Sequence, residues 1–299
     1  MLRVLIAALL AVAVCATAVW AIAPDGQEEI CNTPAVIFCD NFEARALGAG
    51  DLQRSTFKNT GWPTNDSTNI TVINDPANVF SGSRALQLRY PAGGGGIGFM
   101  NPALGGAYRT VYMRWYTKWS PSYQFSPIAT KHVMALTANG SSEYIFWASS
   151  SGTGLPAPIS TLGLVTFAQF SPASVTYQAN RNGDFIPGPD RWYCLEMRVT
   201  QNSTATSADG YLQGWVDGVQ HWEYPNQTLD NRMPNEITSF DLSGYWNCLG
   251  PLFGCDKPAD QHPLMYRWHD AFVVSTARIG CIATTPSAPP AAPTGVTVR

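Results

Sequence analysis

Charged side chains are scarce in this chain: Asp, Glu, Lys and Arg make up 13% of its 299 residues, and the formal net charge is −3. Nucleic-acid-binding proteins need a basic surface to neutralise phosphates, so this composition argues against that class. The helix formers Glu and Lys are few, whereas Trp, Tyr, Thr and Val, which favour strands, and Gly and Pro, which favour turns, are plentiful. The composition therefore also argues against a helical bundle.

Motifs for metal and phosphate binding are missing as well. No CxxC or paired HxxxH spacing indicates a zinc site. The glycine run in Pro91–Gly98 lacks the strand–GxGxxG–helix context that phosphate binding needs, so we interpret it as a flexible loop.

The N-terminus has the pattern of an export signal. One positive charge precedes an apolar run, Val4–Val19, that is too short for a comfortable membrane span and is followed at once by polar sequence. Cleavage after Ala18 or Ala21 fits the small-residue rule. We therefore assign residues 1–23 to a signal peptide, and we expect a secreted protein, extracellular or periplasmic, with no membrane span.

Cysteine usage agrees with an oxidising compartment. Removal of the signal leaves six cysteines, an even number that suggests up to three disulfides. They are Cys31, Cys39, Cys194, Cys248, Cys255 and Cys281. The short CLGPLFGC loop makes Cys248–Cys255 the clearest expected pair. The alternative, a free-thiol nucleophile, is disfavoured by the even count.

Residues 24–284 read as one all-β domain. Short runs of period-two alternation are separated by turn residues, and no helix-length period of 3.6 residues is present. Clear examples are Ser83–Tyr90, Trp192–Thr200, Tyr266–Thr276 and a hairpin turning at Asp217-Gly218. Roughly ten to a dozen short strands without helices predict two antiparallel sheets packed face to face, a jelly-roll β-sandwich. Residues 285–299 form a Pro/Ala-rich linker tail.

The stretch Arg109–Leu136 contains two strand-like segments joined by a Pro/Ser turn. Because strand side chains alternate between faces, one face of the first segment would be polar and aromatic. It would carry Tyr112, Arg114, Tyr116 and Lys118. The other face would enter the core with Met113, Trp115, Thr117 and Trp119. In the second segment, strict alternation sends His132, Met134 and Leu136 to the core and Lys131, Val133 and Ala135 to the polar face. Such a face can hold a polar polymer lying flat.

Several segments together resemble a known fold family. These are FCDNFE near the start, VYMRWYTKWSPSYQF with TKHVMAL, RWYCLEMRV with DGYLQGWVDG, and HDAFVVSTARIG near the end. They resemble the concanavalin A-like jelly roll, and within it the laminin-G-like and polysaccharide-lyase-like branch, over Ile37–Ile282. The resemblance implies a curved sheet whose concave face holds a glycan. Its motifs identify the sandwich better than the chemistry.

Two kinds of jelly-roll enzyme can be tested against the residues. Glycoside hydrolases need two carboxyl groups at a set separation, and the ExDxxE pattern of the laminarinase type is absent. A polysaccharide lyase instead removes the C5 proton of a uronic acid, which requires a cation at the carboxylate and groups that transfer protons. The residue types that a lyase needs are present, although the Gln-x-His and Tyr-Lys-rich strands typical of jelly-roll alginate lyases are not. Their nearest counterparts are Lys131-His132 and Tyr266-Arg267.

The candidate catalytic residues follow from these requirements. Arg114 and Lys131 would neutralise the carboxylate, Tyr116 would transfer a proton, and His132 or His269 would act as the base. The structural alternative for His132 is a hydrogen-bonded core histidine, and for Arg114 it is an ordinary solvated strand charge. Substrate-binding candidates are Tyr112, Lys118, Glu196, Arg198, Gln213, Trp215 and His269.

A second hypothesis belongs to a different class. A secreted, non-catalytic carbohydrate-binding module needs only aromatic side chains and hydrogen-bond donors on the same face. In either case we expect a monomer whose partner is a polysaccharide, with no required cofactor. Laminin-G-like sandwiches often hold a structural calcium ion, and Asp40, Glu43 and Asp270, with Asn41, offer oxygen ligands.

Overall fold

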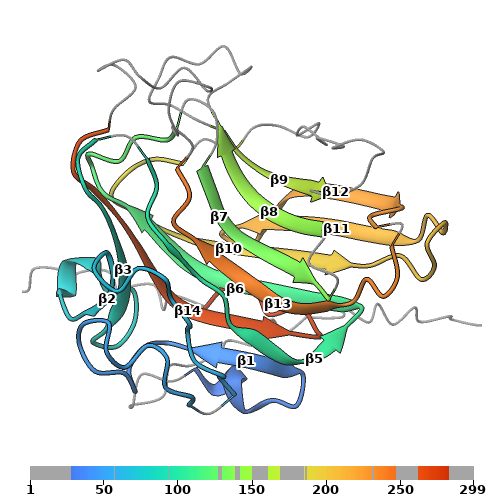
Figure 1. The fold of residues 1–299 in the computed structure, drawn as a ribbon, viewed down its shortest axis with the longest axis horizontal. Helices are drawn as coiled ribbons and strands as arrows, with labels where there is room; N and C mark the ends of the chain where they lie inside the picture. The colour runs from blue at the N-terminus through green and yellow to red at the C-terminus, as the bar shows by residue number, and fades with distance from the viewer. Residues whose placement is uncertain are drawn as a thin grey trace, which may run out of the picture.

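The computed structural model describes residues 28–56, 58–93, 95–126, 130–138, 142–149, 161–168, 185, 187–230, 232–246 and 262–282. Two antiparallel sheets are layered face to face, with β7, β8 and β13 lying in front of β6, β10 and β14 in Figure 1. The predicted all-β sandwich is confirmed. The export signal, the linker tail and the Cys248–Cys255 pair lie outside the described residues.

The larger sheet has eight strands in the order β12-β11-β10-β6-β14-β3-β2, and β1 also pairs with β14. Its strands are β1 (Val36–Asp40), β2 (Ile70–Ile73), β3 (Ala85–Tyr90), β6 (Thr110–Trp119), β10 (Trp192–Thr200), β11 (Gly210–Val216), β12 (Val219–Gln227) and β14 (Met265–Ser275). The predicted hairpin is β11–β12, and its turn residues Asp217 and Gly218 both have positive φ, as a two-residue hairpin turn requires.

The smaller sheet has six strands in the order β4-β13-β7-β8-β9, and β5 also pairs with β13. Its strands are β4 (Phe99–Met100), β5 (Ala103–Tyr108), β7 (Thr130–Thr137), β8 (Ser142–Ser149), β9 (Thr161–Ala168) and β13 (Ile237–Ser243). Two short 3-10 helices, η1 (Glu29–Asn32) and η2 (Pro76–Asn78), complete the described elements. No helix in this part of the chain is long and apolar enough to cross a membrane.

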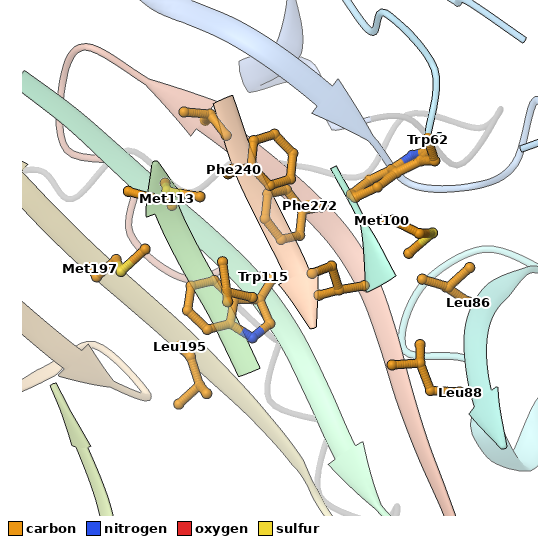
Figure 2. Packing of buried hydrophobic residues seen from close by; sticks show 14 of the residues in the cluster. Trp62, Leu86, Leu88, Met100, Met113, Trp115, Leu195, Met197, Phe240 and Phe272 are labelled. Carbon is orange, nitrogen blue, oxygen red and sulfur yellow. The ribbon is translucent and has the colours of Figure 1, made fainter. Parts of the chain in front are cut away.

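The core fills the space between the sheets. Phe240 of β13 stacks on Phe272 of β14, with ring centroids 4.8 Å apart, and Trp62 packs edge-on against both (Figure 2). Alternation in β6 sends Met113 and Trp115 into the same core, as predicted. Burying one such large apolar side chain stabilises the fold by about 1.5–3 kcal/mol, so this layer holds the two sheets together.

Because β7 contains a bulge, part of its predicted alternation between core and outer face is wrong. The pairing of β7 with β8 shifts register between Lys131 and Met134. An extra residue in a strand places two successive side chains on one side. Val133 and Ala135 therefore join the core, where Met134 and Leu136 were expected.

The outer face of the larger sheet is partly covered by the two ends of the described chain. Residues 28–35, before β1, lie against β6 and β14. Residues 276–282, after β14, lie against β6 and β10. The disulfides Cys31–Cys39 and Cys194–Cys281 fasten these two segments. The predicted polar face of β6 is consequently an interior surface at its centre, and only its flanks remain accessible.

Candidate functional site

Arg114 and Tyr116 lie under the covering segments. Arg114 has no exposed surface, and its Nη2 donates to Glu28 Oε2 at 2.5 Å. Tyr116 stacks on Phe80 with ring centroids 3.7 Å apart, and its Oη accepts from the backbone N–H of Ile282. Burial raises the pKa of Tyr116 to about 12. Both side chains hold chain segments in place, so the groove predicted above them is wrong.

His132 and His269 lie between the sheets, and neither is exposed. Burial, together with the positive charge of Arg267, lowers the pKa of each imidazole well below its ordinary value. Both therefore stay neutral in the core, away from any polymer outside. For His132 this matches the structural alternative, because its Nδ1 lies 2.7 Å from Arg267 Nη1.

Lys131 takes a different place, on the outer face of the smaller sheet. Its Nζ lies 5.2 Å from the ring centroid of Tyr245, and its backbone N–H donates to the Tyr245 carbonyl at 3.2 Å. Met134 follows on the same face, opposite Asp241 of β13. We call Lys131, Met134, Asp241 and Tyr245 the Lys131 surface. Lys131 and Tyr245 are half-buried, whereas Met134 and Asp241 are buried, so the accessible part of the surface is a cation beside a phenol.

Arg267 lies directly beneath this surface, on the core side. It is fully buried, and its Nη1 donates to the Lys131 carbonyl at 3.3 Å as well as to His132 Nδ1. Its Nη2 donates to the Ser243 carbonyl on β13. One guanidinium therefore ties the β7 bulge to β13 and fixes the backbone that carries Lys131.

In the part of the chain that the structure describes, the charge of Arg267 is stabilised by neutral groups only. Its guanidinium carbon lies 5.8 Å from the ring centroid of Tyr90, and its hydrogen-bond acceptors are two backbone carbonyls and an imidazole. Within the described residues no carboxylate forms an ion pair with it. A buried charge of this kind costs free energy, and it creates a positive potential under the Lys131 surface. An anionic group outside would be attracted there. Sequence reasoning missed this role, although Arg267 alternates with Met265 and His269 on a core-facing side, which was a readable signal.

The predicted calcium ligands are all engaged by N–H donors. Asp40 Oδ2 accepts from Arg45, Asn59 and Trp62, and Oδ1 accepts from a backbone N–H. The Glu43 and Asp270 carboxylates each accept from backbone N–H groups of loop 80–84 or its surroundings. Among the described residues, no three metal-ligating side chains gather into a cluster. These carboxylates order loops.

Three of the predicted substrate-binding residues are held in structural contacts. Lys118 forms an ion pair with Asp190 at 2.8 Å. Glu196, expected to bind substrate, accepts from the backbone N–H groups of Ile279 and Gly280. Burial raises the pKa of Glu196. His269 is in the core, as described above.

The remaining four come together. Tyr112 on β6, Arg198 on β10, and Gln213 and Trp215 on β11 occupy neighbouring positions on the outer face of the larger sheet. This group lies on the opposite side of the sandwich from the Lys131 surface. Tyr211, two residues before Gln213 on β11, joins them, because the Arg198 guanidinium carbon lies 4.6 Å from its ring centroid.

Comparison with known proteins supports the architecture. No family model and no curated protein matches the chain. Among solved structures, a mutant of the alginate lyase Aly36B in complex with an alginate trisaccharide is similar, with a TM-score of 0.60 and 10% identity over 81% of this chain and 98% of that one. The Aly36B structure without substitutions gives a TM-score of 0.59 and 11% identity, covering 82% and 98%. At this identity, the likeness shows a shared sandwich fold.

Proposed function

We propose that this protein is a polysaccharide lyase that cleaves a uronic-acid-containing glycan by β-elimination, and that it acts at the Lys131 surface. The observation that carries the proposal is the stacking of two cations at one point of the smaller sheet. Lys131 lies outside and Arg267 lies buried beneath its carbonyl. A uronate carboxylate bound there would contact the Lys131 ammonium directly. The buried Arg267 guanidinium would attract the same carboxylate electrostatically from the other side of the sheet.

The chemistry requires neutralisation before proton loss. The ionised carboxylate attached to C5 disfavours loss of the C5 proton, because a second negative charge develops beside the first. Pairing the carboxylate with a cation stabilises this carbanion-like transition state. The C5 proton then passes to a base, the electrons form the C4=C5 double bond, the C4–O bond breaks, and the leaving oxygen takes a proton. We assign to Lys131 the neutralisation of the substrate carboxylate. Tyr245, whose ring lies beside the ammonium, is assigned proton transfer.

The substrate class follows from charge and from fold. The positive site favours an anionic polymer over a neutral one. One of the solved structures with a similar fold is a complex of an alginate lyase with an alginate trisaccharide, so alginate is the first polymer to test. A third structure of the same lyase holds an alginate tetrasaccharide, with a TM-score of 0.57 and 11% identity over 82% of this chain and 98% of that one.

Export belongs to the same proposal, because the substrate is an extracellular polymer. The apolar N-terminal run supports it. The two disulfides of the structure also support it, since they form and persist in oxidising compartments.

The test is to incubate the purified protein with alginate, glucuronan, pectin and glycosaminoglycans, and to follow absorbance near ~230–235 nm, where the unsaturated product of β-elimination absorbs. We expect a rise with at least one polymer. Lys131→Ala should abolish it, and Tyr245→Phe should reduce the rate by at least about 100-fold, the usual contribution of a proton-transfer group.

Lys118→Ala is the matched control, because it removes a lysine from the opposite side of the sandwich. Lys118 is buried and, besides its ion pair with Asp190, donates to the Ala77 carbonyl at 3.0 Å, so the variant should lose some stability. Once its folding has been checked by tryptophan fluorescence, the folded variant should keep the parental rate. Full activity in Lys131→Ala, or equal loss in Lys118→Ala, would refute the assignment of the site.

A further inference from the structure

A second surface of the protein has the make-up of a ligand site and takes no part in the proposed chemistry. It consists of Tyr112, Arg198, Tyr211, Gln213 and Trp215 on the outer face of β6, β10 and β11, and we call it the Arg198 surface. The register sets Tyr112 opposite Arg198, and Arg198 opposite Gln213, in one row across three strands. Four of the five side chains are half-buried, whereas Trp215 is almost fully buried.

Arg198 is the centre of this surface. Its guanidinium carbon lies 4.6 Å from the ring centroid of Tyr211 and 5.6 Å from that of Tyr112. Nη1 donates to Gln213 Oε1 and Nε donates to Thr200 Oγ1, each at 3.1 Å. These contacts hold the guanidinium between two rings in a fixed orientation. The side chain therefore loses little conformational entropy when a ligand binds, and the entropic cost of binding is smaller.

The acceptors of Arg198 are neutral. A second arginine nearby, Arg278, lies over the Trp215 ring at 4.7 Å, but its charge is balanced by Glu196 at 3.8 Å. The neighbouring Glu223 accepts from the Tyr211 hydroxyl. Within the described residues no carboxylate pairs with Arg198, so the surface offers one cation that a ligand anion can satisfy.

The shapes also fit one class of ligand. Sugar rings place C–H groups against aromatic faces, while their hydroxyl groups bond to planar amides. A carboxylate pairs with a guanidinium through two parallel hydrogen bonds. Tyr112 and Tyr211 supply aromatic faces, and Gln213 supplies an amide, next to the cation. Trp215, which is almost fully buried, stacks on Tyr112 with centroids 6.4 Å apart and helps to hold its ring. A nucleic acid is a poor match, because the whole chain carries a net charge of −3.

We propose that the Arg198 surface is a second, non-catalytic binding site for an acidic glycan, on the side of the sandwich opposite the Lys131 surface. Arg198 pairs with a uronate carboxylate, and Tyr112 and Tyr211 contact the sugar rings. The site rests on the proposed function only in the choice of glycan. Its effect would be to keep a long polymer near the protein between cleavage events.

The experiment measures polyuronate binding in a Lys131→Ala background, so that no substrate is consumed. Affinity electrophoresis in gels containing alginate or polygalacturonate gives the dissociation constant. Arg198→Gln should weaken binding by at least about tenfold, and Arg198→Lys, which keeps the charge but loses the planar fork, should fall between the two. Arg54→Gln is the matched control, since it removes one exposed arginine far along the chain from this surface and should bind as its parent does.

Activity then separates the two surfaces. With Lys131 intact, Arg198→Gln should cleave short oligosaccharides at the parental rate and long polymer more slowly. If no variant or parent cleaves anything but Arg198→Gln still loses binding, the binding site stands and the lyase proposal fails. Unchanged polymer binding in Arg198→Gln would overturn the binding site, as would an equal loss in Arg54→Gln. Equal binding of a neutral glycan that also depends on Arg198 would overturn the acidic class.

Discussion

Two arginines, Arg114 and Arg267, are both fully buried in strands of the larger sheet, yet they are compensated in opposite ways. Arg114 points outward from β6 and meets the Glu28 carboxylate. Arg267 points inward from β14 and meets the carbonyls of Lys131 and Ser243 and the imidazole of His132. One charge is neutralised, and the other remains a source of positive potential.

The difference separates stability from function. An ion pair under a chain segment fastens that segment, and it does so without requiring access to solvent. A buried cation with neutral acceptors costs desolvation free energy that packing must offset, and natural proteins tolerate such costs mainly where function requires them. We therefore assign Arg114 to the closure of the fold and Arg267 to the support of the Lys131 surface. Three substitutions test this assignment.

Removing the partner of Arg114 should have the largest effect on stability. Glu28→Leu leaves a fully buried guanidinium without its carboxylate, which typically costs about 3–5 kcal/mol. Denaturant unfolding followed by tryptophan fluorescence measures the loss. The double substitution Glu28→Leu with Arg114→Met removes both charges, and it should recover a large part of that loss. If Glu28→Leu lowered the free energy of unfolding by less than about 1 kcal/mol, Arg114 would have to be exposed or hydrated, and the prediction would be wrong.

Replacing Arg267 should lower the rate of product formation as well as the free energy of unfolding. Arg267→Met removes the buried charge but leaves the Lys131 and Ser243 carbonyls without their donor, so we expect a loss of about 1–3 kcal/mol. The rate of unsaturated product formation should fall at least about tenfold, because the backbone beneath Lys131 is no longer fixed. Arg114→Met in the presence of Glu28→Leu, which leaves β7 untouched, should keep the parental rate once it is folded. Equal rates in both backgrounds would remove the distinction between the arginines.

The strand pattern of the sequence was enough to predict the class of fold and the core face of β6. Alternation depends only on neighbouring residues, and Met113, Trp115 and Trp119 lie in the core where the period placed them. The β11–β12 hairpin was equally accessible, because its turn residues have a local conformational requirement.

The candidate site depended on features that no local pattern contains. The bulge in β7 reverses the faces of Met134 and Leu136, and it is held by Arg267, a residue more than a hundred positions away. The covering of Arg114 and Tyr116 likewise comes from Glu28 and Ile282, far along the chain from β6. Period-two reasoning put the right residue types on the right strands, but it could not predict which outer face the rest of the chain would cover.

The smallest effect concerns the imidazole that accepts from Arg267. Burial and the nearby guanidinium lower the pKa of His132 in the folded state, so that below about pH 6.5 the unfolded chain binds a proton that the folded chain does not. This group therefore removes stability as the pH falls below 6.5, by up to about 1.4 kcal/mol per pH unit.

His132→Gln keeps an acceptor for Arg267 but cannot titrate, so the free energy of unfolding should decline less steeply with acid than in the parent. Buried Asp270 shifts in the opposite sense, because burial raises its pKa, and it is present in both proteins, so it cancels in their difference. Parallel unfolding curves from pH 7 to pH 5 provide the measurement. Identical slopes would mean that His132 takes up its proton in the folded protein as readily as in the unfolded chain, and a protonated imidazole could not accept from Arg267.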